Sequence, residues 1–345
     1  MKHRKLFFLL MIVPMLFVYT GCSKDEDPVT PPPQINEAQV LAEYLEANGD
    51  FLNTAAPAVT SAKVLYADLL AKPDKIHVID IRTQADYETK GHISGAIRVD
   101  LKNIVTYMKG LANVASYEKI VIACYSGQSA GVAVSVLRLL GYNTVSSLKF
   151  GMSSWNAACA ASWVPNTGYG NNYTNFVTTD APKAAAGTLP TINTGKTTGK
   201  EILEARITQF LATTSASPFD DIRVTWSTVT GNLSNYYIVN YWSAADYAKG
   251  HLPGAIQYTP RADLKLSAAL KTLPTNKPIA IYCFTGQTSA QVSTILKLLG
   301  YDAKTLMFGV NIMNYDWMKA NGIANSFNPT EDIFSYPFVL GPNPK

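Results

Sequence analysis

An internal repeat constrains the fold of this chain more than any other feature. The run Gly91–Ile97 (Gly-His-Ile-Ser-Gly-Ala-Ile) recurs as Gly250–Ile256 (Gly-His-Leu-Pro-Gly-Ala-Ile). In both copies a cysteine, Cys124 or Cys283, follows the histidine of this run by 32 residues, and a Leu-Leu-Gly-Tyr sequence follows the cysteine. Because these landmarks recur in the same order and at the same spacing, the chain is predicted to contain two copies of one structural unit.

The pattern within each copy predicts an α/β fold. An amphipathic helical stretch begins each copy, and short apolar runs then alternate with helical stretches. In the first copy the strand-like runs are 76–81, 96–99, 120–123 and 145–148. Strands separated by helices form mainly parallel sheets with helices on both faces. We therefore expect two tandem α/β domains, each a mainly parallel sheet covered by helices on both faces.

The remaining segments are expected to connect and extend these domains. The chain has 345 residues, enough for two domains with cores of ordinary size. Residues 37–165 and 199–328 are predicted to be the domains, 166–198 a linker rich in Gly, Asn, Thr and Ala, and 329–345 a tail with several prolines. The sequence leaves the arrangement of the domains and the oligomeric state open.

Cys124 and Cys283 occupy equivalent positions that suggest chemistry. Each follows a predicted strand and precedes a glycine-containing loop and the start of a helix. Ligands of parallel sheets bind at the carboxyl ends of strands, and loop N–H groups with a helix N-terminus favour a thiolate or an anion that it carries. The alternative is that each is simply a buried cysteine. The loop residues are Tyr125, Ser126, Gly127, Gln128, Ser129 and Ala130 in the first copy and Phe284, Thr285, Gly286, Gln287, Thr288 and Ser289 in the second.

The other cysteine and histidine residues give weaker signals. Cys159 falls on a predicted helix and has no equivalent in the second copy. It is interpreted as a small buried apolar residue, with a resolving thiol for Cys124 as the alternative. His92 and His251 belong to the repeated glycine turn, where structural hydrogen bonding is preferred over a general-base role. Because no His and Cys residues cluster at ligand spacing, we predict no metal site and no cofactor.

The first residues have the pattern of an export signal. Lys2, Arg4 and Lys5 precede an apolar run, residues 7–18, which is shorter than the ~20 residues that a transmembrane helix needs. A small residue and then Cys22 follow this run, a pattern that resembles the lipobox of bacterial lipoproteins. The alternative is an ordinary signal peptide with an incidental cysteine.

The lipobox resemblance implies that residues 1–21 are removed and that Cys22 is acylated. The chain would then be an exported bacterial lipoprotein, anchored to the membrane of the cell envelope on its periplasmic or outer side. Residues 22–36, with an acidic run and three consecutive prolines, would form an extended tether. Removal of the signal takes three of the 29 Lys and Arg residues, leaving 26 against 25 Asp and Glu. This balance argues against a nucleic-acid partner.

Taken together, the repeated motifs resemble the rhodanese family of thiosulfate and persulfide sulfurtransferases. The resemblance covers about 130 residues in each half of the chain. The matching residues are Asp80-Ile81-Arg82, Asp86-Tyr87, Gly91–Ile97 and Cys124 with Gly127 in the first copy, and Asp246-Tyr247, Gly250–Ile256 and Cys283 with Gly286 in the second.

The resemblance implies a mechanism and a set of roles. A small donor, such as thiosulfate, a persulfide or a polysulfide, would pass its outer sulfur to Cys124 or Cys283, and the resulting persulfide would give it to cyanide or a thiol. The loop N–H groups would stabilise the anionic persulfide. Whether a protein is the acceptor stays open. The residues expected to support the two loops are Asp80, Arg82, Asp86, His92, Asp246 and His251.

Both loops depart from the family pattern at one position. Many rhodaneses carry an arginine five residues after the cysteine, where this chain has Ser129 and Thr288. The fixed charge that would bind thiosulfate is therefore missing. This leaves open a catalytically weak or inactive docking or sulfur-carrier module as the alternative function. It argues against a phosphatase with a Cys-loop-Arg site, because phosphoryl oxygens would lack their clamp.

The second copy also departs from the family pattern at residues upstream of its cysteine loop. Asn240 and Trp242 stand where the first copy has Asp80 and Arg82. Arg82 is expected to pair with Asp86 about one helical turn further on, which a tryptophan cannot do. The first copy is thus the closer match to the family at this corner.

Overall fold

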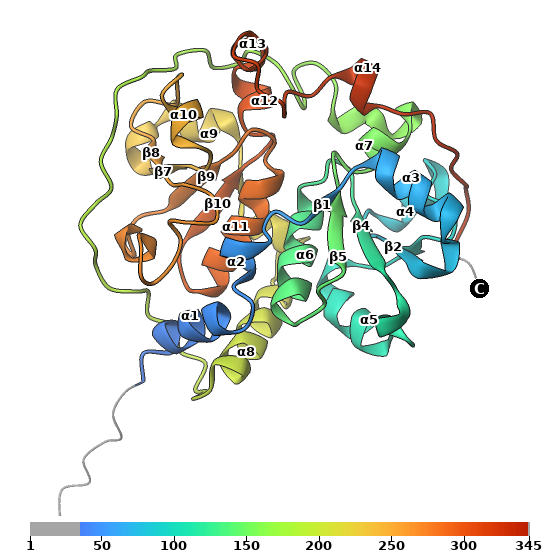
Figure 1. The fold of residues 1–345 in the computed structure, drawn as a ribbon, viewed down its shortest axis with the longest axis horizontal. Helices are drawn as coiled ribbons and strands as arrows, with labels where there is room; N and C mark the ends of the chain where they lie inside the picture. Colours follow the sequence, from blue (N-terminus) through green and yellow to red (C-terminus); the bar gives the residue numbers. More distant parts are fainter. Residues whose placement is uncertain (1–34, 344–345) are drawn as a thin grey trace, which may run out of the picture. The chain divides into compact units, whose positions relative to one another are not determined.

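Two parallel five-stranded sheets form the framework of the protein. The computed structural model describes residues 35–343. The strands of the first sheet are ordered β1-β5-β4-β2-β3 and those of the second β6-β10-β9-β7-β8, and every neighbouring pair is parallel (Figure 1). The two orders are the same when the elements of one copy are replaced by those of the other, so the sequence repeat is also a repeat of topology.

The first copy contributes seven α-helices and five strands among the described residues. Its strands are β1 (Val59–Thr60), β2 (Ile76–Asp80), β3 (Ile97–Arg98), β4 (Lys119–Ala123) and β5 (Val145–Leu148). Its helices are α1 (Glu37–Ala47), α2 (Phe51–Thr54), α3 (Ala62–Ala71), α4 (Gln84–Thr89), α5 (Ile104–Gly110), α6 (Ser129–Leu139) and α7 (Met152–Trp155).

The second copy repeats this order. Its strands are β6 (Arg223–Val224), β7 (Tyr237–Asn240), β8 (Ile256–Gln257), β9 (Ile279–Tyr282) and β10 (Ala303–Leu306). Its helices are α8 (Gly199–Leu211), α9 (Trp226–Gly231), α10 (Ala244–Tyr247), α11 (Gln287–Leu298), α12 (Val310–Met313), α13 (Tyr315–Ala320) and α14 (Pro329–Asp332).

These elements confirm the predicted fold class of two tandem α/β units with parallel sheets. The four strand-like runs of the first copy correspond to β2, β3, β4 and β5. The sequence prediction did not include β1. This strand has two residues and pairs only with β5 at the edge of the sheet, so it is too short to show a periodic pattern.

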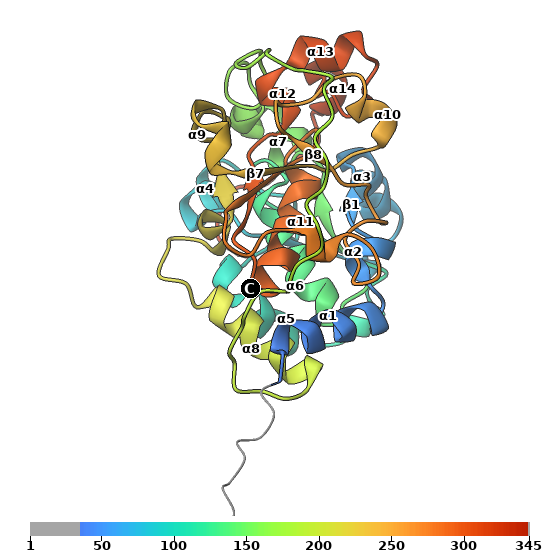
Figure 2. The same cartoon turned by 90° about the vertical axis from the view of Figure 1, so that its left-hand side faces the viewer.

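The helices α6 and α11, which follow the two cysteine loops, pack against each other between the sheets (Figures 1 and 2). Eight consecutive residues of α6, Ala130–Leu137, are buried, as expected for a helix that is apolar nearly all round. The hydroxyl of Ser135 on α6 donates to the main-chain oxygen of Gln291 on α11 at 3.1 Å. Buried residues of both copies form one continuous apolar cluster, so the two copies share a core.

The segment between the copies follows the surface of the second. The main-chain nitrogen of Gly170 donates to the oxygen of Asn311, and Val177 forms an antiparallel bridge with His251. Near its end, Thr194 and Gly195 donate three hydrogen bonds to the carboxylate of Glu37 at 2.7 to 3.0 Å. The segment predicted as a linker is therefore fixed along its length by hydrogen bonds.

The C-terminal segment returns to the first copy. In Figure 1 it runs from α14 back across the helices α3 and α4. Ser335 forms a bridge with Asn156 and Val339 with His92, and the indole nitrogen of Trp155 donates to the oxygen of Pro337 at 2.8 Å. Phe334, Tyr336 and Phe338 pack against an apolar cluster of the first copy, so the tail is anchored on the copy that lies further away in the sequence.

The predicted signal peptide and most of the predicted tether, including Cys22, lie outside the described residues. In residues 35–343, no helix combines the length and the apolar character that crossing a membrane requires.

Candidate active site

The first cysteine loop surrounds its sulfur with main-chain donors. Cys124 directly follows β4 and is only 1% exposed. The main-chain nitrogens of Gly127 and Ala130 lie 3.1 and 3.4 Å from its Sγ atom and donate to it. Hydrogen bonds to an anion stabilise the anion more than a neutral group. This geometry therefore favours a negative charge on the sulfur or on an atom bound to it.

The second loop has the same shape with a different donor set. Cys283 follows β9 and is 4% exposed, and the main-chain nitrogen of Ser289 donates to its Sγ at 3.4 Å. The Cys283 thiol in turn donates to the hydroxyl of Ser289 at 3.5 Å, and that hydroxyl lies 2.7 Å from the Thr305 hydroxyl. The sulfur thus has a neighbouring hydroxyl chain that the Cys124 sulfur lacks among the described residues.

A glycine packs closely against the main chain of each loop. Gly151 has φ 61° and ψ −154°, a region that only glycine occupies readily. A Cβ atom here would overlap the oxygen of Cys124 and lie 2.7 Å from the nitrogens of Ser126 and Gly127. Gly309 has the equivalent place below Cys283, with φ 57° and ψ −137°. The close approach of these glycines fixes the curvature of both loops.

Each loop contains one buried glutamine that forms a hydrogen bond with the opposite copy. The Oε1 atom of Gln128 accepts a hydrogen bond from the main-chain nitrogen of Phe308 at 2.8 Å. The Oε1 atom of Gln287 accepts one from the nitrogen of Phe150 at 3.0 Å. Both glutamines were predicted as loop residues, but their bonds to the opposite copy depend on the packing of α6 against α11, which local sequence patterns do not contain.

Gln287→Ala is expected to lower the free energy of unfolding by about 1–3 kcal/mol, because it leaves the buried N–H of Phe150 without an acceptor. Urea denaturation monitored by far-ultraviolet circular dichroism measures the loss. Gln84→Ala is the matched control, since the Gln84 side chain is exposed and Glu88 is its only bonding partner among the described residues, and it is expected to change stability by less than about 0.5 kcal/mol. Equal effects of the two substitutions would show that the cross-copy bond contributes nothing.

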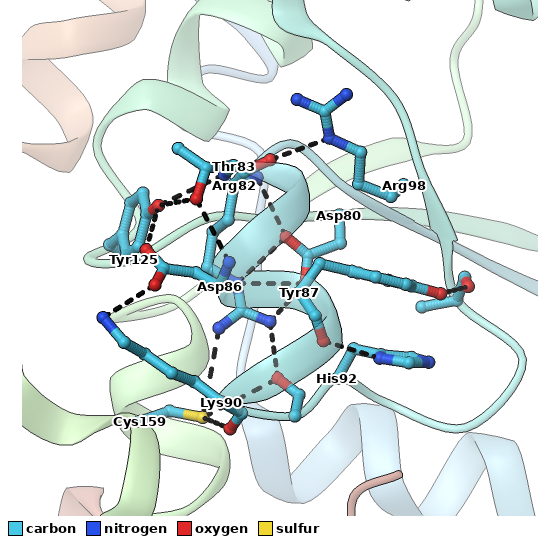
Figure 3. A network of polar contacts seen from close by, with 12 residues as sticks. Asp80, Arg82, Thr83, Asp86, Tyr87, Lys90, His92, Arg98, Tyr125 and Cys159 are labelled. Carbon is cyan, nitrogen blue, oxygen red and sulfur yellow. Dashed lines mark hydrogen bonds and ion pairs between the residues drawn. The ribbon is translucent and has the colours of Figure 1, made fainter. Parts of the chain in front are cut away.

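A buried ion pair supports the first loop from the neighbouring strand (Figure 3). The Nε and Nη2 atoms of Arg82 donate to both carboxylate oxygens of Asp80 at 2.6 to 3.0 Å, and Nη2 also donates to the oxygen of Gly91 at 2.7 Å. The predicted pairing of Arg82 with Asp86 is wrong. Asp80 ends β2 inside the core and requires a counter-charge there, and Arg82 is the residue that supplies it.

Asp86 has partners of its own. Lys90 pairs with one carboxylate oxygen at 2.7 Å and the Tyr125 hydroxyl donates to the other at 2.6 Å. These two contacts, that of Lys90 first, lower the pKa of Asp86. Burial, together with the bond to Asp86, raises the pKa of Tyr125. Tyr125 is therefore a neutral phenol held by Asp86 at the mouth of the first loop.

The second copy replaces the buried ion pair by uncharged contacts. The amide of Asn240 donates to the hydroxyl of Tyr282 at 2.9 Å, and the ring of Trp242 stacks on that of Phe284 at 4.4 Å between centroids. Both charges are lost together, so neither is left buried alone. Asp246, the equivalent of Asp86, pairs with Lys249 at 2.8 Å. Burial raises the pKa of Asp246, but Lys249 and Ser243 outweigh it and the net shift is downward.

The two histidines have the same structural contacts in both copies. His92 stacks on Tyr87, and its Nδ1 lies 2.9 Å from the main-chain oxygen of that residue. His251 repeats both contacts with Tyr247. Neither histidine lines the pockets beside the cysteine loops.

Cys159 lies beside Arg82 at the margin of the core. It belongs to a 3₁₀ helix (Ala157–Ser162), is half-buried and packs against the apolar cluster of the first copy, so it lies in a helix as predicted but is less buried than predicted. Its thiol donates to the oxygen of Lys90 at 3.3 Å, and Nη1 of Arg82 lies 4.0 Å from its sulfur. Burial raises the pKa of the Cys159 thiol despite this arginine, so a thiolate is not favoured here.

A pocket lies beside each cysteine loop, and both copies line each pocket. The first, which we call the Cys124 pocket after the loop beside it, has a volume of about 470 Å³ and is lined by Tyr125, Ser126 and Ser129 of the loop, and by Phe219, Arg223 and Met307 of the second copy. Cys124 itself is buried beneath the loop residues and does not line this pocket. The second, the Cys283 pocket, has a volume of about 530 Å³ and is lined by Cys283, Phe284 and Thr288, and by Pro57, Val59 and Lys149 of the first copy. Sequence spacing could not reveal these contributions from the opposite copy.

No metal-binding cluster accompanies these loops. Within residues 35–343, no three His, Cys, Asp or Glu side chains lie close enough together to hold a metal ion. Hydroxyl groups of the loops and cationic side chains line both pockets, and the sulfur of Cys283 lines the second.

Comparison with known proteins places both halves of the chain in one family. A family model described as the rhodanese-like domain matches residues 62–158 and 232–315. The chain is 36% identical over 84 residues to the thiosulfate sulfurtransferase GlpE of Pseudomonas fluorescens, covering 24% of this chain and 73% of that protein. It is 34% identical over 91 residues to GlpE of Pseudoalteromonas translucida, covering 26% and 82%. The solved structure of a thiosulfate sulfurtransferase from Pseudomonas aeruginosa matches 89% of this chain and 70% of its own, with 16% identity and a TM-score of 0.25.

Proposed function

The chain belongs to the rhodanese family, with two rhodanese-like domains in tandem, and on that premise we propose that it transfers sulfane sulfur through persulfides on Cys124 and Cys283. The observation that carries this proposal is the pair of loops in which main-chain N–H groups point at a cysteine sulfur beside a pocket. Such donors stabilise a thiolate before the reaction and an anionic persulfide after it.

With thiosulfate as the donor, sulfur transfer takes two displacement steps. The thiolate attacks the outer sulfur, a Cys–S bond forms, and the S–S bond of thiosulfate breaks with its electron pair leaving on sulfite. The enzyme then carries a persulfide anion. Cyanide or a thiolate attacks the terminal sulfur, the thiolate of the cysteine is regenerated, and the acceptor leaves as thiocyanate or a persulfide. No proton needs to move in the thiosulfate-to-cyanide sequence, which agrees with the lack of a histidine at either pocket.

A second candidate function is a docking or sulfur-carrier module without turnover. Ser129 and Thr288 in place of a loop arginine favour it, as does the burial of both sulfur atoms. The two functions differ in one assay, the formation of thiocyanate from thiosulfate and cyanide. The purified protein is expected to accelerate thiocyanate formation above the protein-free rate. No acceleration with any sulfane donor would favour the docking module.

Gly151→Ala is expected to slow sulfur uptake by Cys124 about 100-fold. The added Cβ would displace the main chain of the loop, and misplacing donors or reacting atoms by about 1 Å costs rates of this order. The measurement is the rate of sulfur incorporation at each cysteine, followed by peptide mass spectrometry. Gly309→Ala is the matched variant and is expected to slow Cys283 instead. If either substitution affected both cysteines equally, the glycines would not be local supports of their loops.

We also propose that Cys22 is acylated and tethers the protein to the membrane of the cell envelope. The support is the order of charged start, short apolar run, small residue and cysteine in the first 22 residues. In the bacterial host, the wild-type protein is expected in the membrane fraction with a lipid on its N-terminal cysteine. Cys22→Ala is expected to move it to the soluble fraction. Membrane association that persists in Cys22→Ala would contradict the lipid anchor.

A further inference from the structure

We propose that the two pockets are specialised for different sulfur donors. The Cys124 pocket selects a small, doubly charged donor, and the Cys283 pocket selects a donor whose sulfur carries an apolar group. This inference rests on the proposed sulfur transfer and adds the substrate class of each site. It is carried by residues that occupy equivalent positions around the two pockets and differ in charge.

Three cationic side chains besides Arg82 line the Cys124 pocket, namely Arg98, Lys102 and Arg223. Arg82 itself is committed to Asp80, Gly91 and Cys159 and is almost fully buried. The substrate would therefore meet the other three. The carboxylates of Asp100 and Asp220 also line the pocket, so the cations there outnumber the anions even without Arg82.

Arg98 comes from the end of β3, and its side chain lies against the main chain of Arg82 (Figure 3) and lines the Cys124 pocket. Its Nε donates to the main-chain oxygen of Arg82 at 3.0 Å, and its Nη2 pairs with Asp100. Within residues 35–343, its Nη1 makes no hydrogen bond. Arg98 is thus held in place by two groups and keeps a donor for a ligand.

Arg223 reaches the same pocket from β6 of the second copy. Its Nε pairs with Asp220 at 2.7 Å and its Nη1 lies 3.7 Å from the sulfur of Met307. No described residue accepts from its Nη2. Lys102 donates to the main-chain oxygen of Thr213, a neutral acceptor that leaves its charge uncompensated. Guanidinium groups suit oxyanions such as the sulfonate end of thiosulfate. These side chains, which lie outside the loop, supply the positive charge that is missing at Ser129.

Two of these three cations have uncharged counterparts in the arrangement around Cys283, while Lys102 corresponds to Arg261, which donates to the main-chain oxygen of Ala56 and does not line the Cys283 pocket. Gln257 on β8 stands in place of Arg98 and donates to the main-chain oxygen of Trp242 at 2.8 Å, which repeats the positioning bond without the charge. Val59 on β1 stands in place of Arg223 at the equivalent edge strand. Trp242 stands in place of Arg82, but Asn240 also stands in place of Asp80, so this exchange leaves the net charge unchanged. The exchanges of Arg98 and Arg223 are the two that remove positive charge.

The charged groups of the Cys283 pocket balance, and aromatic rings stand beside them. Trp242, stacked on Phe284, joins Tyr241, Pro57 and Pro260 around it. Its charged lining residues are Lys149 and Asp246, one of each sign. Without the net positive charge of the Cys124 pocket, this pocket favours a donor with an apolar aromatic group over a small dianion.

Two donors with the same reaction test this assignment. Thiosulfate is a small dianion, and benzenethiosulfonate is a monoanion with an aromatic ring. Each gives its outer sulfur to a thiolate, with sulfite or benzenesulfinate leaving. The full chain is used as Cys283→Ser, in which only Cys124 reacts, and as Cys124→Ser, in which only Cys283 reacts. The ratio of kcat/KM for thiosulfate to that for benzenethiosulfonate is expected to be at least ten times higher for the Cys283→Ser protein.

Replacing each arginine by the residue at the equivalent position of the other copy then shows which side chains cause the difference in donor preference. In the Cys283→Ser background, Arg98→Gln and Arg223→Val are each expected to lower kcat/KM for thiosulfate about tenfold, mainly through KM. The fall for benzenethiosulfonate is expected to be at least threefold smaller. Lys63→Gln removes a charge from an exposed position on α3 that lines neither pocket, and it is expected to leave kcat/KM unchanged for both donors. Thermal melts show that each variant is folded.

The outcomes separate this inference from the proposed function. Equal donor ratios for the two single-cysteine proteins, or equal falls for both donors in the arginine variants, would overturn the specialisation while sulfur transfer stood. If neither donor placed sulfur on either cysteine, the proposed function and this inference would both be wrong.

Discussion

Replacing both loop cysteines by serine is expected to abolish sulfur transfer, by a factor on the order of 10³ or more, as for the loss of other covalent nucleophiles. A serine hydroxyl is not ionised near neutral pH and cannot form a persulfide. The single variants Cys124→Ser and Cys283→Ser are each expected to retain the activity of the other site. Thiocyanate formation and sulfur content per protein measure these losses.

The remaining cysteine provides the control for this set. Cys159→Ser is expected to keep full activity, since Cys159 contacts Arg82 and Lys90 rather than either loop. Loss of transfer in Cys159→Ser would instead support a resolving role for this thiol. If the double loop variant kept its activity, the cysteine loops would not be the active sites.

Arg82→Met is expected to lower the free energy of unfolding by about 3–5 kcal/mol, the range found when one partner of a buried ion pair is removed. Asp80 is fully buried, and its carboxylate would lose the three donor contacts that Arg82 makes to it. The oxygen of Gly91 would lose its donor as well. Urea denaturation of the purified protein measures the change.

The double variant Asp80→Asn/Arg82→Met shows whether charge is the cause. It removes both charges, as the second copy does with Asn240 and Trp242, and is expected to be more stable than Arg82→Met alone. A double variant that is less stable than the single one would mean that packing around Arg82, and not the unpaired carboxylate, determines the loss.

The sequence contained the information that defines each copy. The repeated glycine turn and the cysteine at constant spacing identified two equivalent units, and the apolar runs identified β2 to β5. Both signals are local, because a strand pattern and a loop motif are set by neighbouring residues. The family resemblance rested on the same motifs and is confirmed by the match of the rhodanese-like domain to both halves.

Features that depend on packing between distant segments could not be predicted. The partner of Arg82 is decided by the burial of Asp80, which a helical spacing rule does not contain. The reach of Gln128 to Phe308 and the placement of Arg223 beside the first loop depend on how α6 packs against α11. The return of the C-terminal tail to the first copy is equally non-local, since its bridges join residues far apart in the chain.

The measurement that tests the account most directly is the intact mass of the purified protein after exposure to thiosulfate or a polysulfide. The account predicts a gain of sulfur that maps to Cys124 and Cys283, disappears on addition of cyanide, and is absent at each position when that cysteine is replaced by serine. A protein that gains no sulfur from either donor, with both loop thiols unreactive, would contradict it.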